Sequence, residues 1–548
     1  MSASDPRPPG HETTEAPALT ALLYGLPHHP GDPVIVSGGQ QLTLGELQAR
    51  VGELAGALRS AGVRPGHPVG NLVAPGPSAA VAMFAAWTAG AVYVPVNRRY
   101  TAPEMRALTE ETPLALVIGE PADLVAHDLR AGAVAHDYQG RDCQVLALAD
   151  PGVPRYDPEI ALVLRTSGTT GRPKAVLLRH SGTLAALDAS LQKLRRRTRP
   201  PAASRSLRMN LIPVSLALWA GIFNTLFSFR AGFGVVLLDR FTTAGFARAV
   251  REHHITSTVL APAMITMLTD ADDVGDLSPL RLVRSITAPL SPQTARQFHD
   301  RFGVLVLNSY GQTELGGEVV GWTAEDLREY GESKLGAAGR PYDHIDLRIS
   351  RPDGSDAETG EPGEIFVRSP FRMDGYALAN GSLDQSADER FVDGYLQTGD
   401  IGLLDEAGFL WVQGRVSDMI NRGGLKVFPD EVEEVLRRHP RVRDAGVAAV
   451  PDRRLGEVPH AWVTGDADLD AGDLESWCRG HLAPYKVPVA FTVVDELPRS
   501  EIGKLLRREL AARFDGGGQT AANPRGPAPA ETVETAANPD GPAPAETI

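Results

Sequence analysis

The chain has 548 residues, enough for two or more domains with sizeable hydrophobic cores. Its apolar content of 43% is ordinary for a globular protein, and its net charge of −14 argues against broad nucleic-acid binding, which needs a basic surface. Cys143 and Cys478 lie far apart, which argues against a disulfide framework or a zinc site and favours a reducing, cytoplasmic location.

Both ends of the chain are predicted to be disordered. Residues 1–17 are polar and rich in proline, unlike a secretory signal. Within residues 515–548, the segment 519–533 is followed by a copy of itself at 534–548 with three substitutions. This tail is rich in Ala, Pro and Thr and has almost nothing to bury, so we expect a flexible extension.

The first strong helix signal begins at Thr43. Thr43 and Glu46 have capping-box spacing, and apolar residues then recur on one face. The uncharged, alanine-rich stretch 79–96 predicts a buried helix followed by a strand, because Gly90 and Pro95 interrupt it too early for a membrane span. Strand-like and helix-like segments then alternate to about residue 310, which indicates an α/β domain with a largely parallel sheet.

A polar loop separates two apolar runs, 160–164 and 175–178, which both predict strands. The loop supplies hydroxyls, glycines and a lysine at Thr166, Ser167, Gly168, Thr169, Thr170 and Lys174. Glycines let backbone amides approach a phosphate, hydroxyls add donors, and lysine adds positive charge. The sequence therefore predicts a phosphate-binding loop, with a surface turn of the same composition as the structural alternative.

Beyond residue 345 the pattern changes. Short strand-like segments with glycine and aspartate turns predict a small β-rich part. A helix is predicted to begin at Pro429, with Asp430 and Glu431 in its first turn, and to end before Pro440. A compact α+β domain is expected from about Asp418 to Phe514.

Four further polar clusters follow the loop. They are NSYGQTE at 308–314, YLQTGDIG at 395–402, GRVSDMINRGGLK at 414–426 and PRSEIGK at 498–504. Each alone can be explained as a polar turn, but their occurrence together in this order is hard to reach by chance. With TSGTTGRPK at 166–174 they resemble the adenylate-forming superfamily of acyl-CoA synthetases, luciferases and peptide-synthetase adenylation domains.

The resemblance runs from about residue 20 to residue 514 and implies the fold. It implies an α/β protein with a large N-terminal domain at 18–416, built of two α/β subdomains and a β-barrel-like part. A hinge is expected at Ser417 and Asp418, although the hinge position usually holds Asp or Lys where Ser417 stands here. A small, mobile α+β C-terminal lid domain would then cover 419–514.

The resemblance also implies a nucleotide site. Besides the loop, the residues expected at ATP or AMP are Ala288, Pro289, Tyr310, Gly311, Asp400, Arg415 and Lys426. Three residues are expected to act in catalysis: Thr313 at the α-phosphate, Glu314 as the ligand of Mg²⁺, and Lys504 at the substrate carboxylate. Both reactants are anions, so positioning and charge neutralisation should dominate this chemistry.

The acyl site departs from the family pattern. Leu216 stands where a histidine is often found, and Ile286 and Thr287 replace small residues. We expect an apolar acyl pocket at Leu216, Leu218, Trp219, Ile286 and Leu315. A second expectation is that Gly423 and Gly424 leave room for the pantetheine arm of CoA.

These patterns predict an ATP-dependent acyl-CoA ligase that uses ATP, Mg²⁺ and CoA. It would activate a carboxylic acid as the acyl-adenylate, release pyrophosphate, and then form the CoA thioester. One alternative is transfer of the acyl group to an amine or a carrier protein. Another is a non-adenylating member that acts on a supplied acyl-adenylate. The sequence leaves open which acid is used and the oligomeric state, a homodimer included.

Overall fold

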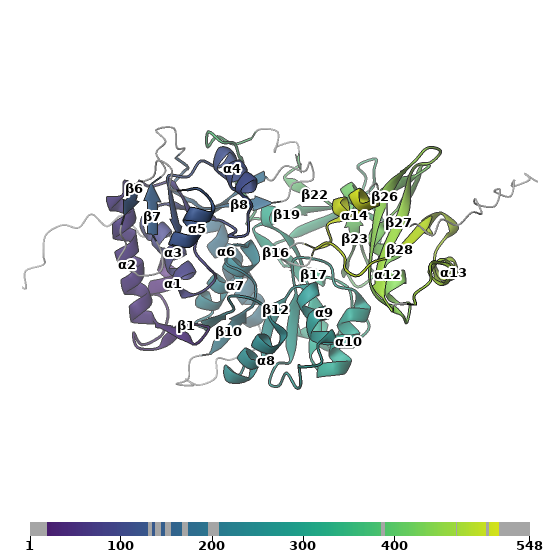
Figure 1. Ribbon diagram of the computed structural model, residues 1–548, viewed down its shortest axis with the longest axis horizontal. Helices are drawn as coiled ribbons and strands as arrows, with labels where there is room; N and C mark the ends of the chain where they lie inside the picture. Colours follow the sequence, from purple (N-terminus) through teal and green to yellow (C-terminus); the bar gives the residue numbers. More distant parts are fainter. Residues whose placement is uncertain are drawn as a thin grey trace, which may run out of the picture.

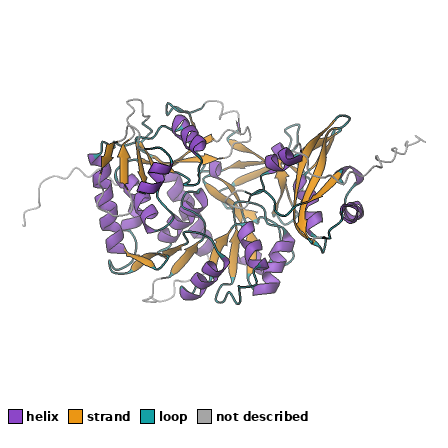
Figure 2. Cartoon of the chain, in the orientation of Figure 1, coloured by secondary structure: helices purple, strands orange, loops and turns teal. Residues whose placement is uncertain are grey.

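The computed structural model describes residues 19–129, 134–136, 144–147, 155–166, 174–195, 208–384, 390–466, 468–499 and 504–514. The two ends predicted to be disordered and the loop residues 167–173 fall outside this set. Figures 1 and 2 show two large α/β halves, smaller sheets beside them, and a C-terminal part at the right of the view.

An eight-stranded sheet forms the first half, in the order β20-β9-β8-β4-β3-β5-β7-β6. Its strands are β3 (Pro68–Leu72), β4 (Val92–Pro95), β5 (Leu116–Gly119), β6 (Val134–His136), β7 (Gln144–Ala147), β8 (Ile160–Thr166), β9 (Lys174–Arg179) and β20 (Gly375–Ala377). The central strands β5, β3, β4 and β8 pair in parallel, as the alternating pattern predicts. In contrast, β8 and β9 form an antiparallel hairpin around the predicted phosphate loop.

A seven-stranded sheet forms the second half, in the order β14-β13-β12-β10-β11-β1-β2. Its strands are β1 (Pro33–Ser37), β2 (Gln40–Thr43), β10 (Met209–Ile212), β11 (Gly234–Leu237), β12 (Ser257–Leu260), β13 (Leu282–Ser285) and β14 (Leu305–Asn308). Only the edge strand β2 pairs antiparallel within this sheet.

Helices form the layers around and between these sheets. The inner layer holds α1 (Ala21–Tyr24), α2 (Leu44–Ser60), α3 (Pro77–Thr88), α6 (His180–Arg195) and α7 (Trp219–Arg230), which share one apolar cluster with strands of both sheets. The outer face of the first sheet is covered by α4 (Ala102–Glu111) and α5 (Pro121–Ala126). The outer face of the second is covered by α8 (Thr243–Glu252), α9 (Pro262–Asp270) and α10 (Pro292–Phe302).

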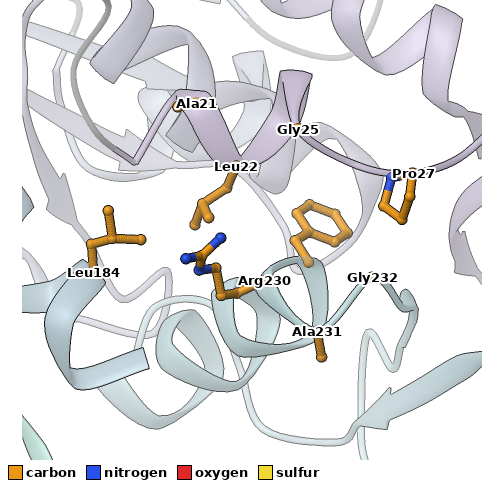
Figure 3. A pocket seen from close by; sticks show the side chains of 9 residues that line it. Ala21, Leu22, Gly25, Pro27, Leu184, Arg230, Ala231 and Gly232 are labelled. Atoms are coloured by element: carbon orange, nitrogen blue, oxygen red, sulfur yellow. The ribbon is translucent and has the colours of Figure 1, made fainter. Parts of the chain in front are cut away.

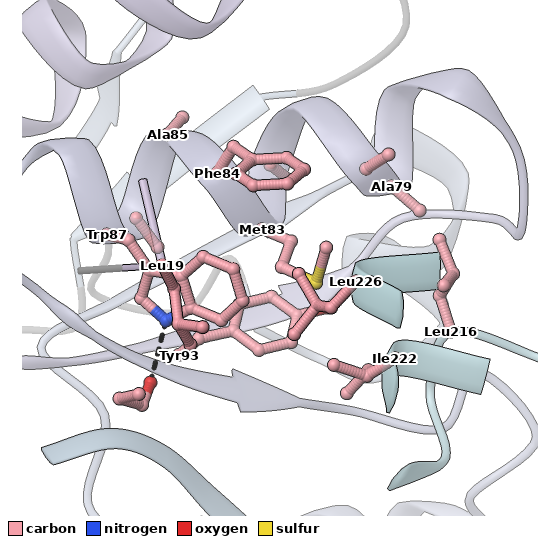
Figure 4. Packing of buried hydrophobic residues seen from close by; sticks show 14 of the residues in the cluster. Leu19, Ala79, Met83, Phe84, Ala85, Trp87, Tyr93, Leu216, Ile222 and Leu226 are labelled. Atoms are coloured by element: carbon pink, nitrogen blue, oxygen red, sulfur yellow. Dashed lines mark hydrogen bonds between the residues drawn. The ribbon is translucent and has the colours of Figure 1, made fainter. Parts of the chain in front are cut away.

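The alanine-rich helix α3 is the centre of the inner layer, where Figure 4 shows Met83, Phe84 and Trp87 packed among residues of neighbouring elements. Every residue from position 79 to position 87 is buried, because small alanines let both sheets approach this helix. Trp87 Nε1 donates a hydrogen bond to the carbonyl of Ala161 on β8 (2.8 Å). The prediction of a buried helix is confirmed, and in the described part of the chain no helix is long and apolar enough to cross a bilayer.

The local signals for helix ends also agree with the structure. Thr43 caps α2, and its side chain and that of Glu46 make both bonds of the capping box. The helix predicted at Pro429 is α12 (Pro429–Arg437), and it ends before Pro440.

Two small sheets pack beside the larger ones around a shared apolar cluster. One holds β15 (Tyr310–Gln312), β16 (Gly317–Gly321) and β17 (Arg340–Pro341), with the short helix η1 (Thr313–Leu315) between β15 and β16 and α11 (Ala324–Tyr330) after β16. The other holds β18 (Asp346–Ser350), β19 (Gly363–Arg368), β21 (Phe391–Val392), β22 (Tyr395–Leu404) and β23 (Leu410–Arg415).

The C-terminal part has a sheet of its own. The strands of this sheet are β24 (Ile420–Arg422), β25 (Leu425–Val427), β26 (Val442–Asp452), β27 (Gly456–Gly465) and β28 (Ala490–Val493). The helices of this part are α12, α13 (Ala471–His481), η4 (Pro484–Lys486) and α14 (Arg507–Phe514). The short helix η3 (Val416–Asp418) joins β23 to β24. The predicted fold class, a large α/β part with a small α+β C-terminal part, is confirmed.

Candidate functional site

The predicted phosphate loop is held at both ends by the β8–β9 hairpin. Thr166 and Lys174 are directly opposite each other in the antiparallel register. The hairpin therefore brings a hydroxyl and a lysine to the same end of the sheet. Ser167, Gly168, Thr169 and Thr170 lie outside the described residues, so their predicted role stays a prediction.

Asp400 makes an ion pair and two side-chain hydrogen bonds with other residues of this region. The pairing of β22 with β23 places it opposite Arg415, whose Nε lies 2.9 Å from Asp400 Oδ1. Its other oxygen, Oδ2, accepts hydrogen bonds from Tyr310 Oη (2.8 Å) and Gln312 Nε2 (2.7 Å). Asp400 is only 5% exposed, so these donors offset the cost of burying its charge.

Tyr310 acts as a hydrogen-bond donor in this arrangement. Its burial, and then the carboxylate of Asp400, raise the pKa of the phenol well above its usual value. Gln312 was not among the predicted site residues. It lies two residues after Tyr310 on β15, and the alternation of a strand turns both side chains to the same face. That spacing was the available sequence signal for Gln312.

Glu314 is buried at 9% exposure in η1, next to the predicted phosphate loop. Its Oε1 accepts hydrogen bonds from Tyr376 Oη (3.1 Å) and from Thr166 Oγ1 (3.5 Å). Gly316, just after this helix, has a φ of +80°, and a Cβ there would lie 2.1 Å from the carbonyl oxygen of Phe371. Glycine at 316 therefore lets the chain turn closely enough to bury Glu314.

The sequence did not single out Tyr376, which bonds Glu314, or Arg390, which bonds Tyr376. Arg390 Nη1 donates to Tyr376 Oη (2.6 Å), and Lys174 Nζ lies 4.7 Å from the centre of the tyrosine ring. Tyr376 reaches this position because β20 pairs with β9, a segment far away in the sequence. No local pattern signals such a pairing.

Lys504, from the C-terminal part, belongs to the same group of charges. Burial, and then the charge of Arg415, lower the pKa of its ammonium below the usual lysine value, whereas Asp418 and Asp400 raise it. The charges of Asp400, Arg415 and Asp418 therefore act on Lys504, and its role at the substrate carboxylate stays a prediction.

Ala288 and Pro289, which are expected at the nucleotide, follow β13. Ala288 is half-buried and Pro289 exposed, and Ser309 Oγ, before Tyr310, donates to the carbonyl of Ser285 (3.4 Å). Thr287 is exposed and has a φ of +75°, which is unusual for a β-branched residue. Position 311, next to Tyr310, accepts only glycine, because a Cβ there would lie 2.1 Å from the carbonyl oxygen of Gly317.

The residues predicted to line the acyl pocket are divided over three apolar clusters. Leu216 is 3% exposed and lies in the inner-layer cluster, where Figure 4 shows it near Ile222. Trp219 packs against that cluster and meets the ring of Phe223 edge-on (5.4 Å between centroids). Ile286 packs with Val214, Val259 and Leu218, and Leu315 is fully buried in the cluster of the small sheets. Their shared role as an acyl pocket remains a prediction.

Gly423 and Gly424 form the turn of the β24–β25 hairpin. Both have positive φ values, +59° and +92°, as a two-residue type I′ turn requires. A Cβ at Gly424 would meet no atom within 4 Å, so the turn is open on that side. Lys426, on β25, is exposed, and among the described residues nothing brings it to the other predicted nucleotide residues.

The predicted hinge residues lie in η3, between two sheets that share no strand. Ser417 Oγ donates to Asp418 Oδ1 (3.1 Å). Asp418 Oδ2 lies 3.5 Å from Nε of Arg507, which also pairs with Asp430 and Glu433. Asp418 is thereby tied to α12 and α14 of the C-terminal part.

The carboxylates fit a magnesium ion that is bound together with a nucleotide. In the described part of the chain, no three His, Cys, Asp or Glu residues cluster closely enough to hold a metal by themselves. Mg²⁺ commonly uses one or two carboxylates and takes its other ligands from substrate phosphates and water. Glu314, beside the loop ends Thr166 and Lys174, meets that requirement.

A separate cavity of about 280 Å³ lies between α1 and the end of α7 (Figure 3). It is lined by Leu22, Leu184, Phe229 and Arg230 among others, and Arg230 Nε is bonded to Asp188 (2.6 Å). None of the residues predicted for nucleotide, acyl or CoA binding lines it.

Comparisons with known proteins find relatives that match both the N-terminal and the C-terminal parts of the chain. A family model described as "AMP-binding enzyme" matches residues 26–377, and one described as "AMP-binding enzyme C-terminal domain" matches residues 431–504. A 2-succinylbenzoate–CoA ligase of Bacillus licheniformis is 33% identical, over 88% of this chain and 97% of its own. A feruloyl-CoA synthase of an Amycolatopsis species is 32% identical, over 88% and 96%.

Two solved structures are similar over nearly their whole length. One is an o-succinylbenzoate CoA synthetase of Bacillus subtilis in complex with its acyl-adenylate intermediate, with a TM-score of 0.73 and 27% identity over 90% of this chain and 98% of that one. The other is an amide bond synthetase of Marinactinospora thermotolerans, with a TM-score of 0.76 and 28% identity over 91% and 99%.

The bonds of Asp400 predict a loss of nucleotide affinity in Asp400→Asn. Hydrogen bonds to a charged group contribute ~1.5–3 kcal/mol, so calorimetry should show ATP binding weakened by ~10–100-fold. Asp346→Asn is the matched control, since Asp346 also bonds a tyrosine and an arginine of the same sheet but is exposed. Equal affinities in the two variants would contradict the assignment.

The charges around Lys504 predict a pH effect. Because Asp418 raises the pKa of Lys504, Asp418→Asn should lower that pKa further. An amine-reactive reagent attacks neutral lysine, so modification of Lys504 should begin at a lower pH in this variant, as read by mass spectrometry. Lys426, exposed on β25, serves as the internal reference. An unchanged profile would place Asp418 outside the electrostatic reach of Lys504.

Proposed function

Because this chain belongs to the AMP-binding enzyme family of adenylate-forming enzymes, we propose that it joins a carboxylic acid to ATP and transfers the acyl group to CoA. The observation that carries the proposal is the buried carboxylate of Asp400, which Arg415, Tyr310 and Gln312 hold in place. The charges of Asp400 and Arg415 also act on Lys504 of the C-terminal part, and together these groups suit a nucleotide and an acid.

The nucleoside end of the site rests on Asp400. A carboxylate has about four acceptor positions, and Arg415, Tyr310 and Gln312 occupy three of them. Two ribose hydroxyls would need two positions, so one protein donor must give way when ATP binds. Tyr310 would then contribute mainly its ring, packed on the adenine.

The phosphate end rests on the hairpin loop and Glu314. Lys174 and the loop hydroxyls would bind the β- and γ-phosphates, and Thr313 would contact the α-phosphate. Magnesium, when bound with ATP, would offset the charge of the phosphates, and Glu314 would hold it. Lys504 would place positive charge beside the substrate carboxylate and the bridging oxygen as pyrophosphate leaves.

The acceptor in the second step is proposed to be CoA. Relatives with CoA ligase and CoA synthase names match nearly the whole chain, which favours this thiol. The similarity to a solved amide bond synthetase favours an amine as the second candidate, and both acceptors follow the same adenylation.

The acid is proposed to be largely apolar, since Leu218, Trp219 and Ile286 border the expected pocket. The names of the relatives make succinylbenzoate-like and ferulate-like aryl acids the first to test. Residues 18–416 are proposed as the N-terminal domain, Ser417 and Asp418 as the hinge, and residues 419–514 as the lid. The proposed location is the cytoplasm.

The test is pyrophosphate release with a panel of aryl and aliphatic acids, with CoA or an amine added in turn. We expect acid-dependent release, followed by a thioester when CoA is present. Glu314→Gln should reduce release by ~10² or more, the scale of losing one preorganised electrostatic group. Product formed only with the amine would establish the second candidate, and no release with any acid would refute adenylation.

The different roles proposed for Lys504 and Gly424 predict that the two half-reactions can be separated. Lys504→Ala should cripple acyl-adenylate formation yet still convert supplied acyl-adenylate and CoA to thioester. Gly424→Leu should do the reverse, because a side chain on the open turn would block the pantetheine arm. Single-turnover product formation from each starting point measures both steps.

The positive φ of Gly424 calls for a control, because any side chain there strains the turn. Asparagine tolerates a positive φ better than leucine does. Gly424→Asn therefore separates the effect of backbone strain from the effect of a large side chain in the path of CoA. If all three variants lose both steps equally while remaining folded, the roles assigned to Lys504 and Gly424 are wrong.

A further inference from the structure

Tyr376 joins three side chains that come from distant parts of the chain. It is 2% exposed, and its hydroxyl donates to Glu314 Oε1 (3.1 Å). The same hydroxyl accepts a bond from Arg390 Nη1 (2.6 Å), and its ring lies beneath Lys174 Nζ (4.7 Å). The predicted metal ligand and the predicted phosphate lysine are therefore both in contact with one tyrosine.

The direction of these bonds is fixed. Arg390 has only donors, so it must use an oxygen lone pair of Tyr376, and the tyrosine proton is left to point at Glu314. An ordinary phenol is protonated at neutral pH, so this proton is available to the carboxylate. Arg390 is itself anchored, because its Nη2 donates to the carbonyls of Gln397 (2.9 Å) and Thr398 (3.4 Å).

The two oxygens of Glu314 are treated differently. Tyr376 and Thr166 both donate to Oε1. Among the described residues no hydrogen bond reaches Oε2. The carboxylate is thus held by one oxygen, with the other available to a hard cation, which prefers oxygen ligands.

We propose that Tyr376 is a positioning residue for the metal end of the site, with Arg390 fixing its hydroxyl. It would orient Glu314 so that Oε2 faces the magnesium of Mg·ATP, and its ring would hold Lys174 beside the phosphates. This inference rests on the proposed function. Partners that orient a metal ligand typically change metal affinity by ~10–100-fold when they are removed.

The alternative is a purely structural role, in which Tyr376 only packs β20 against β9. The hydroxyl and the ring can be tested separately. Tyr376→Phe keeps the ring over which Lys174 lies and removes the bond to Glu314, whereas Tyr376→Leu removes both.

The experiment compares calorimetric binding of Mg·ATP with binding of ATP in EDTA, with no acid present. For Tyr376→Phe we expect Mg·ATP affinity to fall by ~10-fold or more, in line with loss of a metal-orienting partner, while metal-free ATP affinity stays within about twofold. For Tyr376→Leu both affinities should fall, because the cation–π contact of Lys174 is also lost.

Tyr342→Phe is the matched control. Tyr342 is also a buried tyrosine whose hydroxyl bonds a carboxylate, that of Glu318, but neither residue is a predicted site residue. It should leave the ratio of the two ATP affinities unchanged. If Tyr376→Phe and Tyr342→Phe give the same ratio, the positioning role is refuted.

Arg390→Gln keeps the proposal testable if Tyr376→Phe is unstable in thermal melts. It should lower Mg·ATP affinity selectively, and an unchanged ratio would overturn the inference. Failure of the proposed function would look different: the wild type would bind Mg·ATP but release no pyrophosphate with any acid.

Discussion

The buried carboxylate of Asp400 is the interaction on which the site depends. An ionised group at 5% exposure is costly to bury unless donors surround it, and here they come from β15 and β23. Tyr310 and Gln312 connect the sheet of β15 to Asp400. Arg415 connects β23 to Asp400 on the neighbouring strand β22 of the same sheet. The bonds to this one charge therefore set the relative position of the two small sheets.

Glu314, the second buried carboxylate, is held in another way. Asp400 receives protein donors on both oxygens, whereas within the described residues Glu314 receives its bonds, from Tyr376 and Thr166, on one oxygen. The first arrangement suits a group that exchanges hydrogen bonds with hydroxyls. The second suits a group that faces a cation. Two carboxylates of similar burial thereby acquire different tasks from their neighbours alone.

The C-terminal part is stabilised around charges of its own. Arg507 on α14 pairs with Glu433 and Asp430 of α12 and lies near Asp418. Burial raises the pKa of Asp430 to about 6, although Arg507 opposes this shift. Lys504 lies three residues before Arg507, so this network fixes the segment that carries Lys504.

The sequence by itself determined the α/β class, the buried alanine-rich helix, the N-cap of α2, the ends of α12, and the family. These follow from local periodicity, capping residues and the order of short polar motifs, all of which are written in neighbouring residues. The same motifs named Asp400, Arg415, Tyr310, Glu314 and Lys504, and the structure brings these residues to one region.

Only the tertiary structure decided which other side chains join them. Tyr376 meets Glu314 because β20 pairs with β9, and Arg390 is held by carbonyls of β22. It also divided Leu216, Ile286 and Leu315 among separate apolar clusters. The reason is physical: an apolar or aromatic residue has no local signature for its partner, since strand pairing and packing select neighbours by shape across long stretches of chain.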